Sequence, residues 1–153
     1  MKKEELEEFN QILKQYLHHP AVMKMNEYCA HGKISVYQHS LAVAQMAYLL
    51  NKKLSLHGNM ETLLTGAMLH DFYLYDWHDP VRKMPLFQKH GFTHPETARK
   101  NAVRYFDIDQ KTQDVIRCHM WPLTIRSVPL SKEAVIVCLV DKICALKETF
   151  QRF

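Results

Sequence analysis

The stretch LLTGAMLHD, residues 63–71, carries an apolar helical pattern that ends in the adjacent pair His70-Asp71. Leu63, Ala67 and His70 recur at helical spacing, which places them on one face of a helix. Imidazole and carboxylate are common protein ligands for borderline and hard divalent metals. The stretch therefore predicts a helix whose end offers two candidate metal ligands.

Apolar side chains elsewhere in the chain also recur mostly at helical spacing, and only four Gly and six Pro interrupt the 153 residues. The sequence therefore predicts an all-α fold without internal repeats or linkers. We expect helices over about residues 3–18, 20–29, 94–106 and 132–150, and further helices that begin near Ser35, Asn59 and Asp109. The last helix is apolar on nearly all sides through Val140, so we expect it to be central.

Capping boxes indicate where two of these helices begin. Ser35 stands three residues before Gln38, and Thr93 stands three residues before Glu96. Pro95 would then fall in the first turn of the second helix, where Pro is tolerated. These patterns place His39 and His94 near the starts of their helices.

Six candidate metal ligands are spread along the chain: His39, His70, Asp71, His94, His119 and Asp141. Apart from the adjacent His70 and Asp71, consecutive candidates are separated by about one helix and one loop. Such spacing lets packed helices bring single side chains to a common centre. Asp141 follows the apolar run of residues 134–140, and an ionised carboxylate is costly to bury unless it is paired or bound to metal. Each residue alone could be a satisfied core histidine or a buried salt bridge. Together they favour a metal centre.

The order H…HD…H…H…D resembles the HD-domain phosphohydrolase superfamily in its six-ligand, two-metal form. The resemblance covers about residues 35–145 and extends to local settings such as HSLAVAQMAYLL at His39, VIRCHMWP at His119 and VCLVDKICALKE at Asp141. It implies an HD-domain-like helical bundle with a metal site in its centre. We expect residues 1–153 to form one such domain.

The resemblance also implies a division of the ligands between two metal ions. One ion would be held by His39, His70, Asp71 and Asp141, and the second by His94 and His119 with Asp71 bridging. The cofactors would be two divalent ions, and Fe, Mn, Ni, Zn and Mg are all candidates. The implied reaction is hydrolysis of a phosphomonoester, phosphodiester or phosphoanhydride by a water that bridges the two ions.

Within the superfamily, the chain looks nearest to small bacterial members such as the symmetrical diadenosine tetraphosphate hydrolases. Those members usually carry a Lys shortly after the His-Asp pair, whereas Phe72 and Tyr73 follow it here. The chain also lacks the Gly-Tyr-Pro signature of the cyclic-di-GMP phosphodiesterase branch. We therefore expect a small phosphorylated substrate and favour a nucleotide, but these motifs do not identify which one.

Residues 72–92 show no clear periodicity, and long irregular segments are often functional. Within this segment, His78 is a candidate general acid for the leaving group, beside Asp71 in the catalytic set. Arg82, Lys83 and His90 are candidate phosphate-binding residues. A solvent-exposed loop is the alternative for each of them.

Composition limits the other functions that the chain could have. The net charge is +4, but the Lys and Arg are scattered, so a nucleic-acid partner is not expected. No apolar run approaches the ~20 residues needed to cross a bilayer. The N-terminus is not a secretory signal, and the four Cys form no C-x-x-C pair, which favours a cytoplasmic protein. The sequence leaves the oligomeric state open. The competing interpretations are a non-catalytic nucleotide-binding or regulatory HD domain and an RNA- or DNA-binding helical module.

Overall fold

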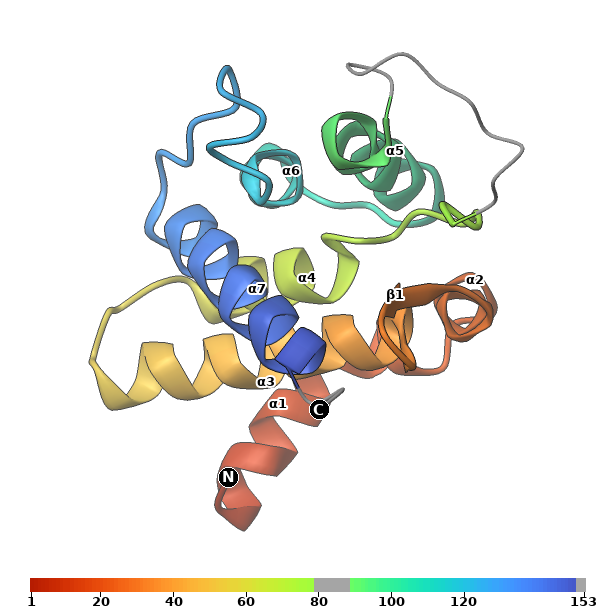
Figure 1. The fold of residues 1–153 in the computed structure, drawn as a ribbon. Coiled ribbons are helices and arrows are strands. Elements are labelled where there is room, and N and C mark those ends of the chain that lie inside the picture. Colours follow the sequence, from red (N-terminus) through yellow and green to blue (C-terminus); the bar gives the residue numbers. More distant parts are fainter. Residues whose placement is uncertain (79–88, 151–153) are drawn as a thin grey trace.

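A computed structural model describes residues 1–78 and 89–150 of the chain. Its helices are α1 (Lys3–Leu17), α2 (Pro20–Met23), α3 (Val36–Lys53), α4 (Met60–Leu69), α5 (His90–Tyr105), α6 (Gln110–Cys118) and α7 (Lys132–Phe150), as Figure 1 shows. A 3-10 helix, η1 (Lys24–Glu27), and two short antiparallel strands, β1 (Cys29–His31) and β2 (Ile34–Ser35), lie between α2 and α3. The all-α fold is therefore confirmed.

Three predicted helix starts are confirmed by their capping hydrogen bonds. The Ser35 hydroxyl accepts the backbone N–H of Gln38, and the Gln38 side chain accepts the backbone N–H of Ser35. Asn59 and Asp109 each accept a backbone N–H three residues further on. These caps fix where α3, α4 and α6 begin, and with them the positions of the histidines on those helices.

The predicted helix over residues 20–29 is wrong beyond Glu27. The chain leaves η1 at Tyr28, enters β1 and turns back into β2 at Gly32, whose φ of 65° suits a residue without a Cβ. The backbone N–H of Val36 donates to the Tyr28 carbonyl. This hairpin leads directly into α3, and it carries His31 on β1.

The capping box predicted at Thr93 and Glu96 is also wrong. α5 begins at His90, with Lys89 at the N-cap position. The Thr93 hydroxyl donates to the Lys89 carbonyl and so bonds back along the helix. Pro95 consequently lies inside α5, where it removes one backbone hydrogen bond. His94 is therefore a residue of the second turn and not of the helix mouth.

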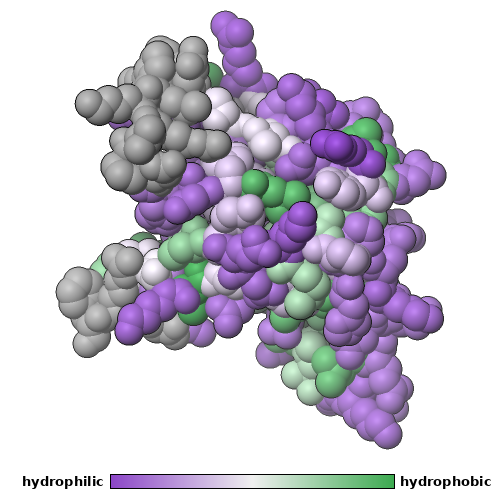
Figure 2. Space-filling view, turned by 90° about the vertical axis from the view of Figure 1, so that its right-hand side faces the viewer, coloured by the Kyte–Doolittle hydropathy of each residue, from purple (hydrophilic) through white to green (hydrophobic). Residues whose placement is uncertain are grey.

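α7 crosses α3, α4 and α6 and is central on one side only (Figure 1). Its other side exposes a stripe of apolar residues at helical spacing: Val135, Leu139, Ile143, Leu146 and Phe150. The expectation of an all-round buried helix fails because no described element packs on that side. The face drawn in Figure 2 is mostly hydrophilic, with hydrophobic side chains in smaller patches. In the described residues, no helix is both long and apolar enough to cross a membrane.

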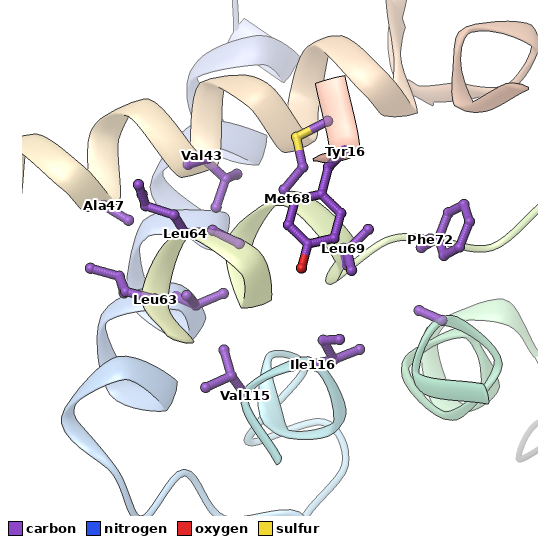
Figure 3. Close-up of a cluster of buried hydrophobic side chains, with 14 of the residues drawn as sticks. Tyr16, Val43, Ala47, Leu63, Leu64, Met68, Leu69, Phe72, Val115 and Ile116 are labelled. Atoms are coloured by element: carbon purple, nitrogen blue, oxygen red, sulfur yellow. The ribbon is translucent and has the colours of Figure 1, made fainter. Parts of the chain in front are cut away.

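The core lies where α4 packs between α3 and α6, and Figure 3 shows side chains of these three helices meeting there. Gly66 permits the close approach of α4 to α6. A Cβ built on Gly66 would lie 2.5 Å from Cγ1 and 2.9 Å from Cβ of Val115. This contact sets the distance between the two helices that end in His70 and His119.

Candidate metal centre

All six predicted ligands meet at one place in the interior. His39 lies near the start of α3, His94 lies in α5 and Asp141 lies in the middle of α7. His70 and His119 cap the C-terminal ends of α4 and α6, and Asp71 follows His70. Their exposed fractions run from 0% to 7%. Chain order alone therefore identified a real cluster, whereas the role of each member as a ligand stays a prediction.

Asp71 stands between two pairs of imidazoles. Its Oδ1 atom lies 3.1 Å from Nε2 of His94 and 3.4 Å from Nε2 of His119. Its Oδ2 atom lies 3.5 Å from Nε2 of His70 and 4.0 Å from Nε2 of His39. The two oxygens of one carboxylate thus face two different groups of nitrogen atoms.

Asp141 faces only one of these groups. Its Oδ1 atom lies 3.0 Å from Nε2 of His39 and 3.5 Å from Nε2 of His70. His39, His70, Asp71 and Asp141 therefore form one set of neighbouring donor atoms, and His94, His119 and Asp71 form another. The two sets also touch, because the donor atoms of His70, His119 and Asp141 lie within 4.8 Å of one another.

Backbone carbonyls orient three of the four imidazoles. The Nδ1 atoms of His70, His94 and His119 each lie 2.7 Å from a carbonyl oxygen three or four residues earlier. A carbonyl oxygen only accepts hydrogen bonds, so each Nδ1 carries the hydrogen. His70 and His119 find free carbonyls because the last turn of a helix leaves them without intrahelical partners. In the neutral form, each Nε2 atom then carries a lone pair that points towards the site.

These lone pairs fit a bound cation. Nε2 of His94 and Nε2 of His119 lie only 2.8 Å apart, and two lone pairs at that distance repel unless a proton or a cation lies between them. Among the buried atoms of the described residues, Nε2 of His70 and Oδ1 of Asp71 have no hydrogen-bond partner. Unsatisfied donor atoms that converge in the core are a strong indication of an ion site. The residues present therefore suit divalent metal ions.

The cluster also shifts the pKa values of its members. Burial would raise the pKa of Asp71, but the nearby His70 and His94 lower it well below its ordinary value. Asp141 behaves likewise, because the hydrogen bond to His39 and the nearby imidazole of His70 outweigh its burial and lower its pKa. Both carboxylates are thus ionised across the physiological range, as metal ligands must be.

The pKa values of His39 and His70 shift in the opposite direction to that of His119. Burial would lower the pKa of His39, but hydrogen bonds to Asp141 and Glu148 raise it to about 10. The charge of Asp71 likewise overcomes burial and raises the pKa of His70. Burial lowers the pKa of His119. Without metal, therefore, His39 holds a proton that a bound cation would displace.

A cavity of about 1240 Å³ opens beside the cluster. The described residues that line it include four of the cluster, Asp71, Asp141, His94 and His119, together with the larger side chains of Tyr73, Tyr75, Trp77, Met120 and Leu123. Lys89 and Lys142 add positive charge to the lining. The volume of the cavity exceeds what a phosphate group alone needs and is large enough for an organic ligand.

The predicted substrate-binding residues have different outcomes. His90 lines the cavity, where its ring stacks on Trp77 and its Nδ1 atom lies 2.9 Å from the Tyr75 hydroxyl. Burial lowers the pKa of His90 to about 3, so it is neutral and offers hydrogen bonds but no positive charge. Arg82 and Lys83 lie outside the described residues.

His78 lies beside Trp77, with ring centroids 3.7 Å apart. It is not among the described residues that line the cavity, and its side chain is 46% exposed. The position of His78 does not support a role as general acid, and that role stays a prediction.

Sequence reasoning missed Glu148 and His31. Oε2 of Glu148 lies 2.9 Å from Nδ1 of His39, and the ring centroid of His31 lies 5.2 Å from that of His39. A signal for Glu148 was present, since it stands two helical turns after Asp141 and so shares its face of α7. No comparable signal marks His31, which approaches through the short hairpin.

Residues 36–146 match the family model described as HD domain. No curated protein and no solved structure matches the chain. The closer resemblance to diadenosine tetraphosphate hydrolases therefore stays a prediction.

Proposed function

The chain belongs to the HD-domain superfamily of metal-dependent phosphohydrolases, and we propose that it hydrolyses a phosphate ester or phosphoanhydride with the help of two divalent metal ions. The family gives the class of chemistry. The number of ions, the activity and the substrate are our proposals.

The position of the Asp71 carboxylate carries the proposal. One of its oxygens faces His94 and His119, and the other faces His70 and His39. A carboxylate placed between two nitrogen-rich groups is suited to bridge two cations. A single ion would leave one of the two groups, with its lone pairs turned inward, without a partner.

Two groups of side chains would hold the two metal ions. One ion would be held by His39, His70, Asp71 and Asp141, and the other by His94, His119 and Asp71. When bound, two such ions supply an activated water as nucleophile and neutralise charge that develops on the phosphoryl oxygens. The two Asp return two of the four positive charges, which leaves about +2 to attract a phosphate dianion.

The cavity indicates what kind of phosphate compound would bind. Lys89 and Lys142 add positive charge to its lining. Tyr73, Tyr75 and Trp77 contribute aromatic rings to the same lining. An anionic group beside a large, mostly apolar surface fits a substrate with a phosphate and a planar organic part. We therefore propose a nucleotide as the substrate.

A metal-supplemented activity screen tests this function. Metal-free protein is given Mn²⁺, Fe²⁺, Ni²⁺, Zn²⁺ or Mg²⁺ and assayed on nucleoside mono-, di- and polyphosphates, cyclic dinucleotides and dinucleoside polyphosphates. We expect metal-dependent turnover that Asp71→Ala abolishes. Asp107→Ala, which removes an exposed carboxylate between α5 and α6, should leave turnover unchanged. Binding of a nucleotide without turnover under every metal would instead favour the non-catalytic interpretation.

A further inference from the structure

His39 differs from the other three histidines of the cluster in the partner of its Nδ1 atom. His70, His94 and His119 each donate from Nδ1 to a backbone carbonyl of their own helical turn, at 2.7 Å. Nδ1 of His39 lies 2.9 Å from Oε2 of Glu148, a residue 109 positions further along the chain. Among these four imidazoles, only that of His39 depends on the side chain of another helix for its orientation.

We propose that Glu148 is a positioning residue of the metal centre, whose carboxylate accepts the Nδ1–H of His39 and thereby leaves Nε2 as the ligand atom. This inference rests on the proposed function, because it gives Glu148 a part in holding the metal. Glu148 itself would contact no metal and no substrate. It would act only through His39.

The setting of the pair favours a fixed orientation. The side chain of His39 is fully buried and that of Glu148 is only 10% exposed. Nε2 of His39 lies 3.0 Å from Oδ1 of Asp141, so the imidazole is held at both nitrogens by carboxylates of α7. Asp141 and Glu148 stand two helical turns apart, and one face of one helix therefore supplies both contacts.

A carboxylate behind a histidine ligand has a recognised chemical effect. It fixes the tautomer and the ring plane, and its negative charge makes the imidazole a stronger base and a stronger ligand. Removal of such partners typically weakens metal binding by about 10- to 100-fold. Glu148 would thus link the last turns of α7 to the stability of the metal centre.

The alternative role for Glu148 is that of a ligand to a separate metal ion. The donor atoms of His31, His39 and Glu148 lie within 4.8 Å of one another, a spacing that could hold an ion of its own. The hydrogen bond to His39 already engages Oε2 of Glu148, and the rings of His31 and His39 meet in an edge-to-face arrangement at 83°. We therefore assign Glu148 the positioning role, and the experiment below includes the other outcome.

The experiment measures Zn²⁺ stoichiometry and affinity by competition with a chromophoric chelator. It compares the wild-type protein with Glu148→Ala, Glu148→Gln and Thr149→Ala. We expect Glu148→Ala to keep two ions but to bind the ion held by His39 about 10- to 100-fold more weakly. Glu148→Gln should lose less, because its amide oxygen still accepts the Nδ1–H. Thr149 is exposed on the same turn, so Thr149→Ala should match the wild type.

Long-range ¹H–¹⁵N NMR of the Zn²⁺-loaded proteins supplies a readout that a merely structural role would not change. The Nδ1 proton of His39 should be slow to exchange in the wild type and in Glu148→Gln. In Glu148→Ala it should exchange rapidly. If the Ala variant does not fold, as judged by circular dichroism, the Gln variant decides by the same two measurements.

The outcomes separate this inference from the proposed function. A wild-type protein that binds no Zn²⁺ overturns both. Wild-type affinity in both Glu148 variants overturns the positioning role alone, as does loss of the protected Nδ1 proton in Glu148→Gln. A stoichiometry that falls from three ions to two on substitution of Glu148 would make it a metal ligand, and would also overturn the positioning role.

Discussion

Oδ1 of Asp71 lies 3.1 Å from Nε2 of His94, although Asp71 follows the end of α4 and His94 lies in α5, 23 residues further along the chain. This approach joins the His-Asp pair at the end of α4 to the histidines of α5 and α6. It makes Asp71 common to both groups of donor atoms.

Substitution of His94 should remove one ion selectively. Nε2 of His94 lies beside Oδ1 of Asp71 and Nε2 of His119, whereas His39 and His70 face the other oxygen of Asp71 and also approach Asp141. We expect His94→Ala to bind about one Zn²⁺ per chain where the wild type binds two. Inductively coupled plasma mass spectrometry of the purified, Zn²⁺-equilibrated proteins gives the stoichiometry. His18→Ala, at an exposed histidine, is the matched control. Loss of both ions or of neither would contradict the division into two groups.

The metal-free protein should become less stable as the pH rises above neutrality. The pKa of His39 is raised to about 10 in the fold, against about 6.5 in an unfolded chain. The folded state therefore holds more protons between these pH values, and the free energy of unfolding falls as the pH rises through them. The lowered pKa values of Asp71 and Asp141 affect the free energy of unfolding only at acid pH, where the stability that the two carboxylates contribute is lost as the pH falls.

Urea denaturation in the presence of a chelator, at several pH values between about 6.5 and 10, measures this dependence. The Zn²⁺-loaded protein should lack the decline, because a metal-bound imidazole carries no proton on its ligand nitrogen. A metal-free protein whose free energy of unfolding is constant or rises over this range would be at odds with a protonated His39.

Gly66→Ala should destabilise the protein although Ala favours helices. The helical preference of Ala over Gly is worth about 1 kcal/mol. The new methyl group would lie 2.5 Å from Cγ1 of Val115, and such overpacking costs about 1–3 kcal/mol. We expect a lower melting temperature and weaker Zn²⁺ binding, because α4 and α6 carry His70 and His119. The double variant Gly66→Ala/Val115→Ala should recover part of the loss. A more stable single variant would mean that α4 and α6 do not approach as described.

Lys89 should contribute to substrate binding by charge. It lines the cavity and is exposed at the start of α5, so its attraction to a phosphate is screened by solvent. We expect Lys89→Ala to raise KM about two- to fivefold, an effect that added salt reduces, and to leave kcat nearly unchanged. Steady-state kinetics with the substrate found in the screen gives both constants. Lys100→Ala, at an exposed lysine of α5 that does not line the described cavity, should leave KM as it is. An unchanged KM in Lys89→Ala would remove it from the binding site.

The sequence predicts the helices and the six-residue cluster well, because both depend on local patterns and chain order. Caps such as that at Ser35 act within one turn of helix, and each candidate ligand stands on an element with a strong apolar pattern. The cap predicted at Thr93 fails because residues 90–93 extend the helix before it. A local motif cannot show that an earlier turn also becomes helical.

Contacts between distant elements account for what the sequence leaves out. Glu148 meets His39 only once α7 has packed across α3, and His31 reaches the same imidazole only through the β1–β2 hairpin. The neutral state of His90 follows from its burial between Trp77 and His94, which composition cannot reveal. These features depend on three-dimensional packing, although the spacing of Asp141 and Glu148 is visible in the sequence.

Native mass spectrometry of the wild-type chain titrated with Zn²⁺, beside Asp71→Ala, is the most direct test of a carboxylate shared by two ions. We predict a wild-type mass increase that saturates at about two ions per chain, and at most one weakly held ion in Asp71→Ala with the helical circular dichroism preserved. A wild-type chain that takes up no ion, or an Asp71→Ala chain that takes up two as tightly as the wild type, would contradict the shared role of Asp71.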